Sequence, residues 1–127
     1  MSFVQMCTPT AGYEGIKPSV VECVKKAGGN PCPPVVVGVG IGGTFEKAAL
    51  MAKQALTRKL GDKSPEAGIA KLEVELLEEI NKTGVGPQGL GGSTTALAVH
   101  VNHFPTHIAG MPVAVNICCH AYRHGVK

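Results

Sequence analysis

Residues 31–44 read Pro31-Cys32-Pro33-Pro34-Val35-Val36-Val37-Gly38-Val39-Gly40-Ile41-Gly42-Gly43-Thr44, an apolar run that opens with prolines and breaks into glycines. Residues 35–39 predict a strand buried on both faces, because a β-branched run offers no polar side to water. The prolines hold Cys32 in a rigid, non-helical segment. We expect the glycines to end the strand and Thr44 to cap a helix whose apolar residues recur at helical spacing as far as Leu56. The start of that helix is a candidate anion site.

The segments on either side predict three further strands and two further helices. Short apolar runs predict strands over residues 3–7, 96–103 and 111–118, and we expect Phe104-Pro105-Thr106 to break the second. One helix is expected to end at Gly28 and another to begin at Ser64. Their buried stripes are Ile16, Val20, Cys23, Val24 and Ala27 in the first, and Ile69, Leu72, Leu76, Leu77 and Ile80 in the second. We therefore expect an α/β fold with a mixed sheet of about four strands packed by about three helices.

The composition narrows the class of protein. A chain of 127 residues predicts a single domain over residues 1–127, and its 17 glycines and 4% aromatics predict an aliphatic core with close backbone packing. The net charge of +3 without a basic run argues against nucleic acid as a partner. The sequence shows neither a signal peptide nor an apolar run of membrane length, so we expect a cytoplasmic protein without a membrane partner. Five cysteines predict reduced thiols or metal ligation.

Residues 38–43 match the G-x-G-x-x-G pattern of dinucleotide-binding folds. In such folds the following helix returns to a second strand, whereas residues 61–65 lead here into another helix. Two interpretations stay open, namely a tight turn that cradles a carboxylate or phosphate, and glycines that only let helix and strand pack closely. The glycine-rich loop of residues 84–95 is likewise either a functional loop or a long connector.

The cysteines and histidines suggest a different chemistry. The chain has no C-x-x-C pair, which disfavours an ordinary zinc site and a thioredoxin-like site. Cysteines far apart in sequence, on segments bounded by glycine or proline, suit an iron–sulfur cluster. We expect Cys7 and Cys23 to be buried hydrophobes and Cys118 and Cys119 to point in opposite directions. His100, His103 and His124 are expected to be ordinary, hydrogen-bonded imidazoles.

Four segments together carry a family resemblance that covers essentially the whole chain. They are residues 30–44, the loop at 86–92, Pro105-Thr106-His107 and the run Val115-Asn116-Ile117-Cys118-Cys119-His120. The chain resembles class I fumarate hydratases, the iron–sulfur hydro-lyases that also include L-tartrate dehydratases. The likeness implies the second half of the family's α region, with the upstream α segment and the β region absent from this chain.

The resemblance also implies a set of site residues. Cys32 and Cys119 match two of the three cysteines that hold a 4Fe-4S cluster, and His107 matches a histidine of the substrate pocket that we take as catalytic. Gly42, Gly43 and Gln88 are expected to contact the dicarboxylate. Ser93 departs from the family, where a basic residue commonly follows the glycine pair, and Cys7 lies too close to Cys32 to match the third ligand.

The implied function is the reversible hydration of fumarate to L-malate by an assembly in which this chain alone is inactive. The implied partners are the remaining α segment, the β subunit and a dicarboxylate substrate, and we expect an oligomer. An L-tartrate dehydratase α piece is the first alternative, and a non-catalytic module for anion binding or assembly is the second. Nucleotide binding ranks third.

Overall fold

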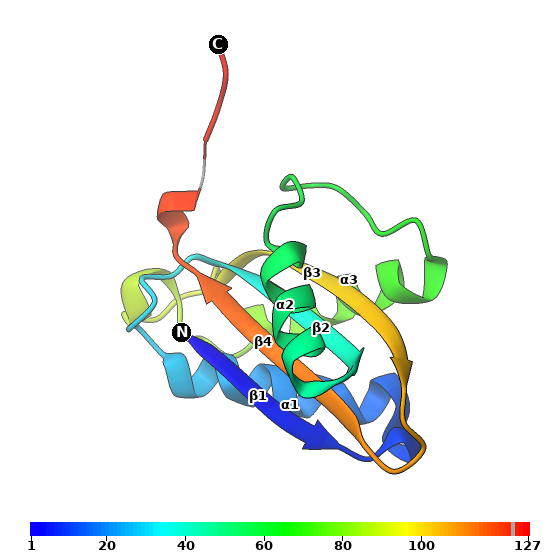
Figure 1. Cartoon of the computed structure of the whole chain (residues 1–127). Coiled ribbons are helices and arrows are strands. Elements are labelled where there is room, and N and C mark those ends of the chain that lie inside the picture. Colours follow the sequence, from blue (N-terminus) through cyan, green and yellow to red (C-terminus); the bar gives the residue numbers. More distant parts are fainter. Residues whose placement is uncertain (123) are drawn as a thin grey trace.

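A four-stranded mixed sheet in the order β1-β4-β2-β3 lies at the centre of the computed structural model, which describes residues 1–122 and 124–127 (Figure 1). The strands are β1 (Ser2–Cys7), β2 (Val35–Gly43), β3 (Ala96–Thr106) and β4 (Met111–Cys118). The helices are α1 (Gly12–Ala27), α2 (Phe45–Ala55) and α3 (Ala67–Asn81), with short 3-10 turns η1 (Pro9–Ala11), η2 (Pro87–Gly89) and η3 (His120–Tyr122). The expected α/β fold is confirmed. In the described part of the chain, every helix is too short or too polar to cross a membrane.

The helices cover both faces of the sheet. β2 pairs with β3 in parallel and with β4 antiparallel, and β1 pairs antiparallel with β4. α1 and α3 pack on one face and α2 packs on the other, as Figure 1 shows. The larger core lies between the sheet and the α1–α3 layer. It includes Ile16, Val20, Val37, Val39, Ile69, Leu76, Ile80, Val99, Val113 and Val115.

The glycines after Val37 do not end β2, contrary to the sequence prediction, and the strand runs on to Gly43. A Cβ atom built on Gly38 would lie 2.2 Å from the Ala52 carbonyl oxygen, and one on Gly40 would lie 2.0 Å from that of Ala48. Both contacts are with the backbone of α2. Of the two interpretations left open, the structure supports close packing of helix and strand rather than a tight turn.

β3 also extends further than predicted, because Phe104-Pro105-Thr106 continues the strand. β3 is an edge strand, so Pro105 can lie in it without removing a hydrogen bond from a central ladder. The more polar face of β3 lies under α2. There His100 is 2% exposed, with its Nδ1 3.2 Å from the Ala55 carbonyl oxygen, and the Asn102 amide donates to the Met51 carbonyl at 3.2 Å.

The helix predictions are confirmed apart from the start of α3 and two side chains. α3 begins at Ala67 rather than beside Ser64, whose hydroxyl oxygen instead accepts the Glu66 amide at 3.3 Å. Leu77 is only partly buried against the core. Phe45, expected on the apolar stripe of α2, is 59% exposed.

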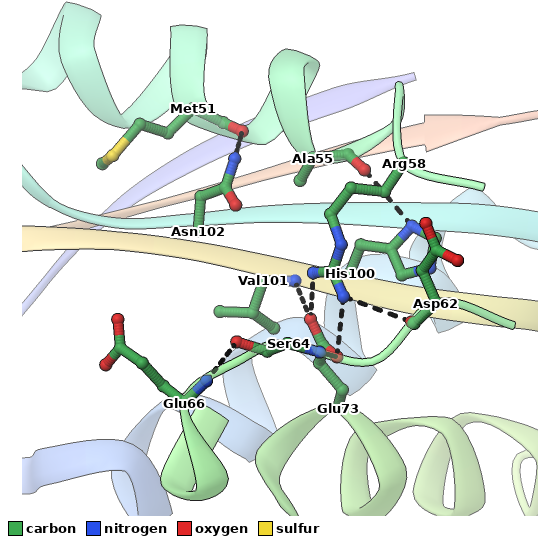
Figure 2. A network of polar contacts seen from close by, with 10 residues as sticks. All are labelled: Met51, Ala55, Arg58, Asp62, Ser64, Glu66, Glu73, His100, Val101 and Asn102. Atoms are coloured by element: carbon green, nitrogen blue, oxygen red, sulfur yellow. Dashed lines mark hydrogen bonds and ion pairs between the residues drawn. The ribbon is translucent and has the colours of Figure 1, made fainter. Parts of the chain in front are cut away.

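One amide on the free edge of β3 is satisfied by a glutamate on the apolar stripe of α3, four residues after Ile69. Glu73 is 6% exposed, and its Oε1 accepts the Val101 amide at 2.8 Å (Figure 2). The Arg58 guanidinium pairs with both carboxylate oxygens, and the Ser64 amide donates to Oε2 at 3.3 Å. This network fastens the segment between α2 and α3 to the sheet edge.

Candidate functional site

Three segments that are distant in sequence meet at the end of the sheet where β2 begins and β4 ends. They are the segment of residues 28–34 before β2, the glycine-rich loop of residues 84–92, and residues 119–120 after β4 (Figure 1). The Gln88 amide donates to the Pro33 carbonyl at 2.8 Å, and the His120 amide donates to the Cys32 carbonyl at 3.5 Å. A Cβ atom on Gly29 would lie 2.8 Å from the Gln88 carbonyl oxygen, so the first two segments touch through backbone. The structure therefore brings Cys32, Gln88 and Cys119 together, and we call this region the cysteine end.

Cys32 is presented by a constrained backbone. Its φ is 55°, in the left-handed region that L-residues other than Asn, Asp and Gly rarely adopt. Its amide donates to the Gly29 carbonyl at 3.0 Å, while its own carbonyl accepts from the His120 amide. The Pro33–Pro34 peptide bond that follows is cis. Cys32 itself is exposed, so the thiol is held by its backbone and is open to a ligand or partner.

Cys119 lies one residue beyond the end of β4, and Cys118 is the last residue of that strand. Cys118 packs against the small apolar cluster of Val36, Leu56 and Ala98. Cys119 is half-buried, and its chain neighbour His120 contacts the Cys32 carbonyl. Cys119 therefore directly precedes the residue that contacts Cys32, and its role as a ligand stays a prediction.

Gln88 uses its side chain within the protein. Its φ is 57°, again in the left-handed region. Its side-chain amide donates to the Pro33 carbonyl at 3.2 Å and lies 3.5 Å from His120 Nδ1. In this structure the amide therefore braces the segment before β2, and the substrate contact predicted for it would require it to leave that position.

His107, Gly42 and Gly43 lie at the opposite end of the sheet. A Cβ atom on Gly42 would lie 2.0 Å from the Phe104 carbonyl oxygen, so this glycine permits β2 and β3 to touch. His107 is in the turn between β3 and β4, where its Nδ1 accepts the Ala109 amide at 3.0 Å. The nine residues of β2 separate the two ends by about 25 Å. Within one chain, these three residues and the cysteine end do not form one site.

The predicted anion site at the start of α2 already faces a carboxylate of this chain. Glu46 lies in the first turn, and the Thr44 hydroxyl donates to its Oε1 at 2.8 Å. A hydrogen bond from its own backbone amide and the one from Thr44 hold the pKa of Glu46 below its usual value. Glu46 is therefore the anion that this helix start stabilises.

The other cysteines lie away from Cys32. Cys23 is 8% exposed in the main core, where burial raises the pKa of its thiol, so the buried role predicted for it is confirmed. Cys7 pairs with Met111 at the far end of β4 and is half-buried. Over residues 1–122 and 124–127, no three His, Cys, Asp or Glu side chains are grouped to hold a metal ion. Two thiols on anchored segments nevertheless match in kind the thiolate ligands of an iron–sulfur cluster.

His120 is a member of the site to which sequence reasoning assigned no role. Its Nδ1 lies 2.9 Å from the Cys32 carbonyl oxygen. The sequence signal was its position directly after Cys119, but only the fold shows that it contacts a residue 88 positions away.

Comparison with known proteins gives one consistent family. The model of the family described as "Fumarate hydratase (Fumerase)" matches residues 1–127. A protein of Methanocaldococcus jannaschii named "Putative L(+)-tartrate dehydratase subunit alpha" is 50% identical over all 127 residues. The L(+)-tartrate dehydratase subunits alpha of Escherichia coli K12 and Shigella sonnei are each 40% identical over 117 residues, or 92% of this chain. The chain covers 45% of the first relative and 39% of the other two, less than half of their length.

Proposed function

This chain belongs to the fumarate hydratase family, and on that premise we propose that it forms part of a 4Fe-4S-dependent hydro-lyase that acts on a four-carbon dicarboxylate. The observation that carries the proposal is the meeting of Cys32 and Cys119 at one end of the sheet, although 87 positions separate them in sequence. A packing role alone does not explain why backbone hydrogen bonds join the two segments that carry these cysteines.

Cys32 and Cys119 would hold the cluster through their thiolates, and a third thiolate would come from outside these 127 residues. When bound, the cluster supplies Lewis-acid chemistry toward the hydroxyl group and one carboxylate of the substrate. The chain's own contribution is positional, because the loop of residues 84–92 and His120 brace the segment that carries Cys32. We expect the group that removes the substrate proton to come from a partner.

The proposed partners are the remainder of an α region and a β subunit. The relatives are named as alpha subunits, and this chain spans less than half of their length. In such an assembly, the role predicted for His107 requires it to act at a site formed with another chain. At about 25 Å from its own cysteine end, His107 can reach only the cysteine pair of another chain.

The proposed site has two candidate substrate pairs. The sequence resemblance led us to expect fumarate and L-malate, whereas the names of the relatives favour L(+)-tartrate. Both reactions add or remove water at a hydroxyl-bearing carbon of a four-carbon diacid, so one site design serves either. We therefore assay both substrates.

The test is anaerobic loading with iron and sulfide of the chain combined with its cognate α segment and β subunit. We expect cluster absorption and hydro-lyase activity in the wild type, and loss of both in Cys32→Ser and in Cys119→Ser. Cys7→Ser, at the far end of the sheet, is the matched control and should load normally. Equal iron content in all three variants, or no iron uptake by the complete assembly, would refute the proposal in favour of a non-catalytic module.

A further inference from the structure

We infer that His120 is a positioning residue that fixes the Cys32 backbone, and with it the thiol, beside Cys119. The inference deepens the proposed function, because it rests on the two thiols acting together as ligands. Its structural basis is the contact between the His120 ring and the Cys32 carbonyl, which joins the segments that carry the two cysteines.

The hydrogen-bond chemistry fixes which ring nitrogen carries the proton. His120 Nδ1 lies 2.9 Å from the Cys32 carbonyl oxygen, and a carbonyl oxygen can only accept. Nδ1 therefore carries hydrogen and donates it. Gln88 Nε2, 3.5 Å from the same Nδ1, is itself a donor and satisfies the Pro33 carbonyl instead. Two side-chain donors thus hold consecutive carbonyls: His120 holds that of Cys32, and Gln88 holds that of Pro33.

The conformation of Cys32 explains why this position needs an anchor. A residue with a Cβ atom at φ 55° is less stable than in the extended or right-handed regions and persists only where its surroundings hold it. The amide of Cys32 is held by Gly29, so rotation of the segment is limited from that side. Among the described residues, His120 holds the carbonyl, by its ring at 2.9 Å and more weakly by its amide at 3.5 Å. Loss of the ring donor frees the carbonyl half of Cys32, which is the half tied to the segment that carries Cys119.

The inference predicts a difference between two conservative substitutions. In His120→Asn the side-chain amide nitrogen takes the place of Nδ1 and can still donate to the Cys32 carbonyl. In His120→Gln the side-chain amide nitrogen takes the place of Nε2, so it cannot donate to the Cys32 carbonyl. His120→Ala removes both ring nitrogens. His103→Ala is the control, because His103 is a partly exposed histidine of β3 that pairs with Glu66.

The measurement is the rate at which dibromobimane bridges Cys32 to Cys119 in the reduced chain without iron. All proteins carry Cys118→Ala, so that the neighbouring thiol does not compete, and mass spectrometry of the digest identifies the bridged pair. Loss of one hydrogen bond should slow bridging by about three- to tenfold in His120→Gln and His120→Ala. His120→Asn and His103→Ala should bridge at the parent rate. Thermal unfolding of each variant establishes that it is folded.

The outcomes separate this inference from the proposed function. Equal bridging in all variants, or equal slowing in His120→Asn and His120→Gln, would overturn the positioning role. Neither result depends on iron, so a failed cluster-loading experiment would leave the bridging result unchanged. Conversely, a chain that loads iron normally but bridges independently of His120 would keep its proposed function and lose this inference.

Discussion

Gly40→Ala should strongly destabilise the fold, because it places a methyl group between β2 and α2. The added Cβ would lie 2.0 Å from the Ala48 carbonyl oxygen and 2.8 Å from the Ala52 amide nitrogen. Real Cβ atoms keep more than 3.0 Å from other heavy atoms, so α2 must move away from the sheet by about 1 Å. That movement loosens the contacts of Ala48, Met51, Ala52 and Ala55, which are all buried.

The expected loss in unfolding free energy is about 3 kcal/mol, at the upper end of the range for overpacked sites because the clash is with backbone. This is a large part of the total stability of a small domain, which is about 5–15 kcal/mol. Urea unfolding followed by far-ultraviolet circular dichroism measures it. Gly68→Ala is the control, because Gly68 lies in α3 with open space around it and should gain about 0.5–1 kcal/mol of helix stability.

A Gly40→Ala protein within 0.5 kcal/mol of the wild type would refute the packing argument. It would mean that the α2 layer shifts freely, and that the glycines of β2 serve something other than close approach. Loss of stability in Gly68→Ala as well would show that any added methyl group is harmful, and would remove the site-specific interpretation.

Two further predictions concern the polar network of Figure 2. Glu73→Gln leaves Arg58 without its carboxylate and should cost about 2 kcal/mol in urea unfolding, less than a fully buried pair because the Arg58 side chain is 21% exposed. Glu79→Gln on the exposed face should stay within about 0.5 kcal/mol, and equal effects would contradict a special role for Glu73. Burial, aided by Arg58, lowers the pKa of His100, so protonation favours the unfolded chain and stability should fall as pH drops below about 6.5. His100→Gln should flatten this dependence between about pH 7.5 and 5.5, and an unchanged slope would refute the assignment.

The order and type of the elements could be predicted because each apolar pattern is local. The stripe of α1 and the alternation of β4 match the structure, since both patterns follow directly from helix and strand geometry. The extent of β2 could not be predicted in this way. Glycine favours turns locally, and only the approach of α2 shows why Gly38 and Gly40 belong to a strand. Similarly, Pro105 fits inside β3 only because that strand lies at an edge.

The residues of the candidate site could be named from the sequence, but their positions in the fold could not be predicted. The family resemblance implied Cys32 and Cys119, and the fold then brought their segments together. It also implied His107, but a matching motif does not show at which end of a strand a residue lies. Helical periodicity places Glu73 on the apolar stripe of α3, four residues after Ile69, but only the fold shows which groups its carboxylate pairs with, the Val101 amide and the Arg58 guanidinium.

The strand order also determines when β1 can fold. β1 is synthesised before its pairing partner β4, whose residues begin 104 positions after Cys7. At a synthesis rate of 5–20 residues per second, roughly 5–20 s pass before that partner exists. During this interval the uncharged segment Ser2–Cys7 has no β4 to pair with, and such segments are prone to join other strands. β2, α2 and β3 all precede β4 in the chain, so the strand that joins β1 to the rest of the sheet is the last of the four to be synthesised.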